Sequence, residues 1–120
     1  MQETDPITVV EIPEFLNATR KLLSNDERAE LVEYLAYNPA AGTVIPGAGG
    51  IRKLRWGLEG RGKRGGARVV YFFHNLKMPL FLLTAYAKNE REDLSHNDYA
   101  SFQQLTKALV NSYQNRRPKP

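Results

Sequence analysis

Two nearly continuous apolar runs, at residues 67–74 and 80–87, constrain the fold more than any other feature of the sequence. Both runs are rich in β-branched and aromatic residues, and the turn-like segment 75–79 joins them. Such runs are typical of strands, and apolar residues without polar alternation indicate burial on both faces of a sheet. We therefore expect a central β-hairpin that is covered by other elements on each side.

Two further strands are predicted around this hairpin. Residues 51–56 alternate, so Lys53 and Arg55 should project from one face of a sheet and apolar residues from the other. Residues 7–12 form a short β-branched segment between two prolines, which indicates another strand. These patterns predict a small, mostly antiparallel sheet of about four strands.

Two helices are predicted between the first strand and residue 39. Apolar residues recur at helical spacing over residues 13–23. Ser24 and Glu27 match a capping box, so a second helix should begin there and end before Pro39. Residues 40–50 are rich in Gly, Pro and Ala and are expected to form a loop.

A third helix is predicted near the C-terminus, where residues from Tyr99 to Tyr113 show helical apolar spacing. Its candidate N-cap is Asn97 or Asp98. Together the elements predict an α+β fold, in which the small antiparallel sheet packs against two N-terminal helices and one C-terminal helix.

The composition agrees with one soluble domain over residues 1–115, followed by a basic tail at 116–120 that should fray. Because the sequence has no Cys, disulfide scaffolds, thiolate metal sites and Cys nucleophiles are excluded. The apolar runs are too short to cross a membrane, and the acidic N-terminus is unlike a basic signal peptide. We therefore expect a cytoplasmic protein.

Positive charge is concentrated in the middle of the chain. Residues 47–91 contain ten basic and two acidic residues, a net charge of +8, whereas residues 1–46 carry −5 and the whole chain +4. Such asymmetry within one domain is typical of proteins that bind a polyanion. A solvated basic loop without a ligand would have the same composition.

The Gly-rich segment 57–66 contains a GxxxxGK match, but it is not expected to bind a nucleotide. Arg64 stands where Ser or Thr would coordinate magnesium, and the segment leads into a strand instead of a helix. Its unshielded backbone N–H groups and basic side chains suit contact with an RNA backbone. The candidate RNA-contact residues are Arg61, Lys63 and Arg64 in this segment, together with Arg52 in the preceding strand.

Lys53 and Arg55 are candidates for catalysis, because a strand would hold both on one sheet face, about 7 Å apart. Arg68, at the start of the neighbouring strand, could join them. Three cations on one rigid face would stabilise a dianionic, phosphorane-like transition state. The alternative is that these cations only keep an exposed sheet face soluble.

The two histidines, His74 and His96, are too few for a usual zinc site, and no metal or cofactor is expected. His74 ends a predicted buried strand and suits a core or turn position. His96 lies in a polar stretch and could act as an acid or base near neutral pH. Tyr86 shares a strand face with Lys88 and is the candidate for stacking on an RNA base.

Residues 49–55 (GGIRKLR), 62–71 (GKRGGARVVY) and 82–90 (LLTAYAKNE) resemble toxins of the RelE/HigB superfamily of bacterial type II toxin–antitoxin modules, with the closest likeness to the HigB-type branch. The resemblance implies a microbial-ribonuclease-like fold and a ribosome-dependent endoribonuclease that cleaves mRNA in the A site. In such toxins the 2′-hydroxyl attacks the adjacent phosphate without a metal. The resemblance also implies a helix-turn-helix antitoxin as partner, with DNA contacted only through that complex.

The resemblance further implies roles for single residues. Lys53 and Arg55 match the family's paired basic strand positions, and Arg68 matches its transition-state arginine. Lys88 lies in the family's basic stretch after the last strand. We therefore expect these four residues to act on the phosphate.

Two positions depart from the family pattern. Asn89 stands where several relatives have Arg, and it is a candidate for RNA binding. No Tyr falls at Ser95, near which some relatives carry a catalytic tyrosine, so the adjacent His96 is the candidate general acid or base. These departures leave a second hypothesis open: a non-catalytic inhibitor that binds RNA or the ribosome, or a degenerate toxin retained for antitoxin binding.

Overall fold

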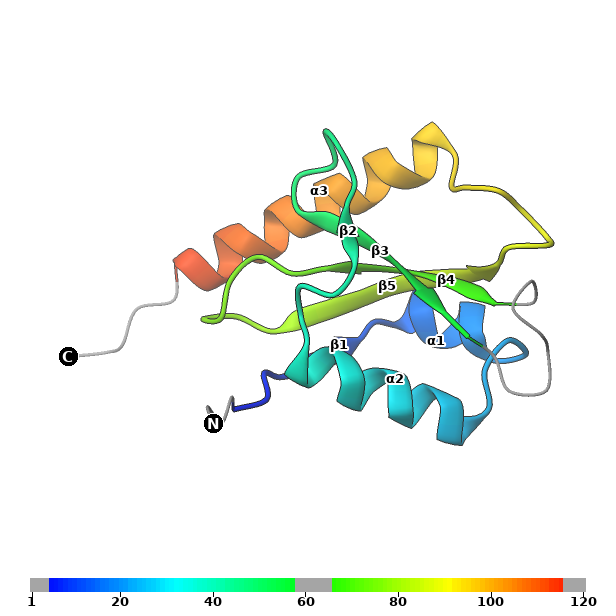
Figure 1. Ribbon diagram of the computed structural model, residues 1–120. Helices are drawn as coiled ribbons and strands as arrows, with labels where there is room; N and C mark the ends of the chain where they lie inside the picture. The colour runs from blue at the N-terminus through cyan, green and yellow to red at the C-terminus, as the bar shows by residue number, and fades with distance from the viewer. Residues whose placement is uncertain (1–4, 58–65, 116–120) are drawn as a thin grey trace.

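The computed structural model describes residues 5–57 and 66–115, which form three helices and five strands (Figure 1). In chain order the elements are β1 (Val9–Glu11), α1 (Pro13–Thr19), α2 (Asn25–Tyr37), β2 (Thr43–Val44), β3 (Ile51–Trp56), β4 (Ala67–Phe72), β5 (Leu80–Ala87) and α3 (His96–Gln114). The strands form one sheet with the order β1-β5-β4-β3-β2.

The hairpin of β4 and β5 lies at the centre of this sheet. β1 pairs with β5 in parallel, and the other neighbouring strands are antiparallel. Helices α1 and α2 cover one face of the sheet and α3 crosses the other (Figure 1). The predicted α+β architecture is confirmed, and so is the burial of β5 on both faces, since all of its residues are buried.

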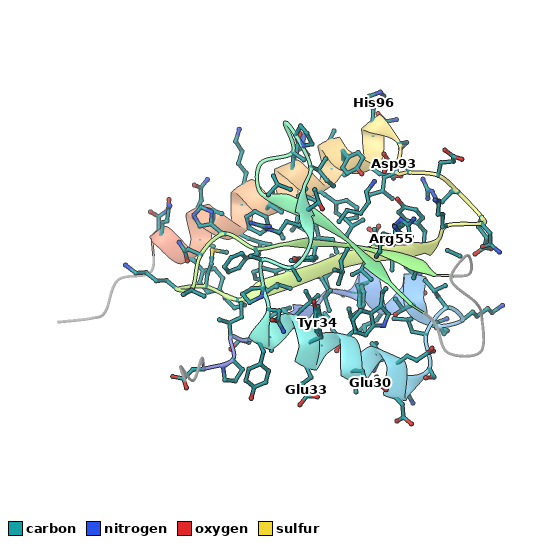
Figure 2. The ribbon with its side chains drawn as sticks, viewed as in Figure 1. Glu30, Glu33, Tyr34, Arg55, Asp93 and His96 are labelled. Atoms are coloured by element: carbon teal, nitrogen blue, oxygen red, sulfur yellow. The ribbon has the colours of Figure 1, made fainter. Side chains whose placement is uncertain are left out.

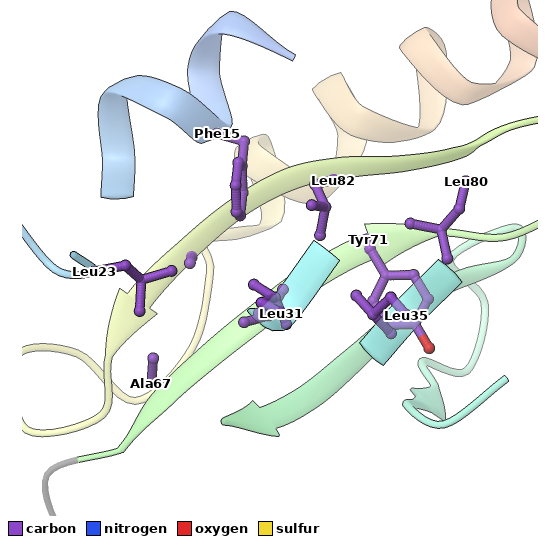
Figure 3. Close-up of a cluster of buried hydrophobic side chains, with 10 residues drawn as sticks. Phe15, Leu23, Leu31, Leu35, Ala67, Tyr71, Leu80 and Leu82 are labelled. Atoms are coloured by element: carbon purple, nitrogen blue, oxygen red, sulfur yellow. The ribbon is translucent and has the colours of Figure 1, made fainter. Parts of the chain in front are cut away.

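Two apolar clusters lie on opposite faces of the sheet. The cluster beneath α1 and α2 includes Phe15, Leu31 and Tyr71 (Figure 3). The cluster beneath α3 includes Phe72 and Phe102. Successive strand residues point to opposite faces, so these two clusters fix the direction of each side chain on β3, β4 and β5.

The buried hydroxyl of Tyr71 fastens the segment before β2 to the core. It donates a hydrogen bond to the Pro39 carbonyl at 2.8 Å and accepts one from the Gly42 N–H at 2.7 Å. A Cβ at Gly42 would lie only 2.8 Å from the Tyr71 ring, so a glycine is required at this close approach. These contacts hold β2 against the edge of β3.

Three predicted boundaries were wrong. The predicted loop 40–50 contains β2, which is too short for a sequence pattern to reveal and pairs only with β3. Helix α1 ends at Thr19 instead of residue 23. Helix α3 has Ser95 as its N-cap instead of Asn97 or Asp98, because Ser95 and Asp98 form a capping box. The predicted tail, 116–120, lies outside the described residues.

Candidate functional site

The face of the sheet that is turned toward α3 carries a row of polar side chains. Arg55 on β3 pairs with Arg68 on β4, and Arg68 pairs with Tyr86 on β5, so the three residues lie in register across the sheet. Lys53 projects from the same face, two residues before Arg55. The structure therefore brings Lys53, Arg55 and Arg68 onto one rigid face, which we call the cationic face.

At the Lys53 end of this face, a single carboxylate oxygen accepts several hydrogen bonds. Asp93 Oδ1 lies 2.8 Å from Lys53 Nζ and accepts hydrogen bonds from the Tyr99 hydroxyl at 2.6 Å and the Leu94 N–H at 2.7 Å. The Tyr86 hydroxyl lies 3.5 Å from the same oxygen. We call Lys53, Tyr86, Asp93 and Tyr99 the Asp93 cluster.

Protonation in the Asp93 cluster follows from these contacts. Burial alone would raise the pKa of the Asp93 carboxyl, but hydrogen bonds from Lys53, Tyr99 and the Leu94 N–H lower it to about 2. Burial, and then the hydrogen bond to Asp93, raise the pKa of Tyr99 to about 12. Burial is the largest single effect on Lys53 and lowers its pKa, but the hydrogen bond to Asp93 and the charges of Tyr86, Tyr99 and Asp93 together outweigh burial and raise the pKa. At neutral pH the Asp93 carboxylate is therefore charged, while Lys53, Tyr99 and the Leu94 N–H each carry the proton that they donate to it.

Arg55 and Arg68 differ from Lys53 because no carboxylate pairs with either of them within residues 5–57 and 66–115. Arg55 is exposed, and Arg68 is half-buried beside Tyr86. Burial raises the pKa of Tyr86, and the positive charge of Arg68 partly opposes this effect. Two unpaired cations on one sheet face attract an anion more strongly than a neutralised pair would. This end of the face can therefore accept a phosphate directly.

Tyr86 does not offer an open ring for base stacking. It is only 7% exposed, and the Arg91 guanidinium lies 5.6 Å from its ring centroid. Its hydroxyl also contacts the Glu92 carbonyl at 3.4 Å. A base could reach this ring only if the segment that carries Arg91 moved away.

The structure does not bring His96 into the Asp93 cluster. His96 is the first residue of α3 and is exposed, and Figure 2 shows it at the outer end of the helix, away from Arg55. Lys88 and Asn89 are exposed in the turn after β5. Asn89 lines a surface cavity of about 570 Å³ beside α1.

Arg52 lies on the opposite face of the sheet from Lys53. Its guanidinium donates hydrogen bonds to the carbonyls of Gly42 at 2.8 Å and Ala40 at 3.2 Å, and it lies 5.9 Å from the Phe73 ring centroid. Strand alternation explains this placement, because neighbouring residues on β3 face opposite helices. Arg52 holds a loop in place and does not join the cationic face, whereas Arg61, Lys63 and Arg64 lie outside the described residues.

Sequence reasoning missed Asp93 and Tyr99. Tyr99 fitted the apolar stripe of the predicted helix, and Asp93 had no motif around it. A signal was present in Ser95 and Asp98, whose spacing matches a capping box and places Tyr99 in the first turn of α3. The contact with Lys53 joins residues 40 positions apart and has no sequence signature.

Neither a metal cluster nor a membrane span was found in the described part of the chain. No group of three or more His, Asp or Glu side chains is close enough to hold a metal ion there. No described helix combines the length and the apolarity needed to cross a bilayer. These findings cover residues 5–57 and 66–115 only.

Comparison with protein families identifies the family of this chain. The family model described as "RelE toxin of RelE / RelB toxin-antitoxin system" matches residues 18–116. The match includes β3, β4, β5, α3 and the segment before α3, which together carry the Asp93 cluster, Arg55 and Arg68. The chain therefore belongs to the RelE toxin family, and it is a toxin of a toxin–antitoxin system.

Proposed function

We propose that this toxin is a metal-independent endoribonuclease that cleaves mRNA in the ribosomal A site and so stops translation in the cytoplasm. The observation that carries the proposal is the row of Arg55 and Arg68, unpaired among the described residues, beside Lys53. RNA cleavage by an internal 2′-hydroxyl needs cations where negative charge develops on the phosphate. The membership of the RelE family supports the same activity.

In the proposed reaction a base takes the proton of the 2′-hydroxyl, and the 2′-oxygen attacks the adjacent phosphorus. The bond to the 5′-oxygen then breaks, leaving a 2′,3′-cyclic phosphate, and the 5′-oxygen takes a proton. Arg55 and Arg68 would stabilise the phosphorane-like transition state, with Lys53 as a third cation. Lys88, exposed after β5, is proposed to contact a neighbouring phosphate.

Tyr99 is the proposed general acid. Its hydroxyl holds a proton at neutral pH, since its pKa is raised to about 12, and it lies on the Lys53 side of the cationic face. His96 remains the candidate predicted from the sequence, but its side chain lies outside the Asp93 cluster. Geometry therefore favours Tyr99 for transferring a proton to the 5′-oxygen.

The proposed partners follow from the charge of this face. Ribosomal RNA and mRNA would bind the cations, and a cognate helix-turn-helix antitoxin would neutralise the toxin and make the contacts to operator DNA. An antitoxin is a general property of toxin–antitoxin systems such as the one in the family description. The helix-turn-helix class and the A site are proposals that go beyond that description.

The test is to map mRNA 5′ ends after brief induction of the toxin. Wild type should give codon-phased cuts, and R55A/R68A should lose them, because each cation contributes about 1–3 kcal/mol to the transition state, or about 5- to 150-fold in rate. The matched control is K77A/K107A, which removes two exposed cations outside the cationic face. If R55A/R68A cuts as wild type does, the proposal is wrong.

One observation favours the second hypothesis, a non-catalytic inhibitor of the ribosome. Lys53, a predicted phosphate contact, is already paired with Asp93 at 2.8 Å. Full-length mRNA on stalled ribosomes in the same mapping experiment would support this hypothesis. Codon-phased 5′ ends would exclude it.

A further inference from the structure

The segment 88–94, between β5 and α3, folds back over the cationic face. It places two of its side chains on groups that RNA would use. Asp93 contacts Lys53 across the sheet, and Arg91 covers the ring of Tyr86. Both contacts come from residues only two positions apart in one turn-rich segment.

Asp93 holds the position that a phosphate oxygen would take. Its Oδ1 accepts from Lys53 at 2.8 Å and from Tyr99 at 2.6 Å, and Tyr86 lies within 3.5 Å. These three donors belong to the sheet and to α3, so they would remain if the carboxylate left. Cationic and hydroxyl donors that converge on one anionic oxygen suit a phosphate as well as a carboxylate.

Arg91 holds the position that a base would take. Its guanidinium lies over the Tyr86 ring, 5.6 Å from the ring centroid, and so covers a face on which an RNA base could stack. Arg91 is held there by the Asp93 carbonyl at 3.1 Å and the Asp98 carboxylate at 3.2 Å. Both anchors are exposed contacts, which are weak individually.

We propose that segment 88–94 occupies the RNA site of the free toxin, with Asp93 in place of a phosphate and Arg91 in place of a base, and that RNA displaces it. The inference rests on the proposed function, since it takes RNA as the ligand of this face. Among residues 5–57 and 66–115, no carboxylate pairs with Arg55 or Arg68. RNA would therefore meet these arginines first and then exchange with Asp93 on Lys53.

The first test measures binding of a short, fluorescently labelled single-stranded RNA whose 2′-hydroxyls carry methyl groups and cannot attack. Asp93→Asn should bind it about twofold to fivefold more tightly than wild type, because RNA no longer has to break a partly exposed ion pair. The matched control is Glu92→Gln, which removes the same charge at the neighbouring position. The Glu92 carboxylate forms no ion pair among the described residues. It should bind as wild type does.

The second test needs no RNA. The labelling of Lys53 by an amine-acylating reagent, read by mass spectrometry, should rise severalfold in Asp93→Asn relative to exposed Lys107. Asp93→Ser, a smaller neutral variant, repeats both tests and guards against a fold defect in Asp93→Asn.

Three results would overturn the inference. The first is an RNA affinity that is unchanged or weaker in the neutral Asp93 variants. The second is a gain in RNA affinity in Glu92→Gln equal to that in Asp93→Asn. The third is unchanged labelling of Lys53 in the Asp93 variants. A loss of cleavage rate at unchanged affinity would instead make Asp93 a positioning residue for Lys53 and Tyr99. Because the methylated RNA cannot be cut, tighter binding by Asp93→Asn would stand even if mapping showed that wild type is not a nuclease.

Discussion

Side-chain direction on β3 places neighbouring cations in different environments. Lys53 and Arg55 face α3 and the proposed RNA site, whereas Arg52 faces the opposite side and supports the Gly42 loop. A count of basic residues in the sequence therefore overstates the cationic face. Alternation predicted that Lys53 and Arg55 share a face, but only the structure shows which helix covers it.

At the residue scale, Tyr99 and His96 can be separated by two conservative substitutions. Tyr99→Phe should lower the rate of mRNA cleavage by about 100-fold or more, because general acid–base groups contribute that much. His96→Gln should leave the rate almost unchanged, since the side chain lies outside the Asp93 cluster. Cleavage of mRNA on purified, programmed ribosomes is the measurement. The opposite result would restore the assignment of His96 that was made from the sequence.

Asp93 should also give the protein a defined acid sensitivity. Its pKa is about 2 in the folded protein and near its ordinary 3.8 in the unfolded chain. A lowered folded pKa contributes stability above the unfolded pKa, and this contribution disappears as pH falls through the folded pKa. The difference in unfolding free energy between wild type and Asp93→Asn should therefore be constant above about pH 5 and shrink between about pH 4 and pH 2.

Urea denaturation of the two proteins at a series of pH values measures this difference. Every other carboxyl group is common to both proteins, so its titration cancels. A difference that stays constant down to pH 2 would show that the ion pair between Asp93 and Lys53 is not formed in solution.

At the scale of elements, the sequence was most informative where an element carries its own pattern. The apolar runs predicted β4 and β5, and alternation predicted β3, each to within two residues of its observed ends. β2 was missed because its two residues pair with β3 and the preceding Gly42 is bonded to the Tyr71 hydroxyl, contacts that act across the fold. The Asp93 cluster was missed for the same reason, since it joins β3 to α3 through a loop.

The two capping boxes permit a matched test of how α3 supports the site. Ser95→Ala and Ser24→Ala each remove a side chain that caps a helix, of α3 and α2 respectively, and each should lower the free energy of unfolding by about 1 kcal/mol. Only Ser95→Ala should also reduce mRNA cleavage, because Tyr99 lies in the first turn of α3 and Asp93 lies just before it. Equal cleavage by the two variants, at a temperature where both are folded, would show that the site does not depend on the α3 cap.

At the scale of the whole molecule, opposite charges lie on opposite faces of the sheet. Arg55 and Arg68 are on the α3 side, while Glu30 and Glu33 lie on the outer side of α2 (Figure 2). A charge separation of this kind orients the protein in the field of an RNA surface and speeds productive encounter. We therefore expect the acidic N-terminal third to help orient the protein on RNA.

This charge separation predicts which residues set the salt dependence of RNA binding. Each cation that contacts a single-stranded phosphate adds about 0.7 to the slope of log K against log salt, so R55Q/R68Q should flatten the slope by about 1.4. E30Q/E33Q alters two charges on the far face and should leave the slope unchanged. Fluorescence anisotropy with the methylated RNA over a series of KCl concentrations measures both slopes. If E30Q/E33Q steepens the slope as much as R55Q/R68Q flattens it, net charge governs binding and the cationic face has no special part in it.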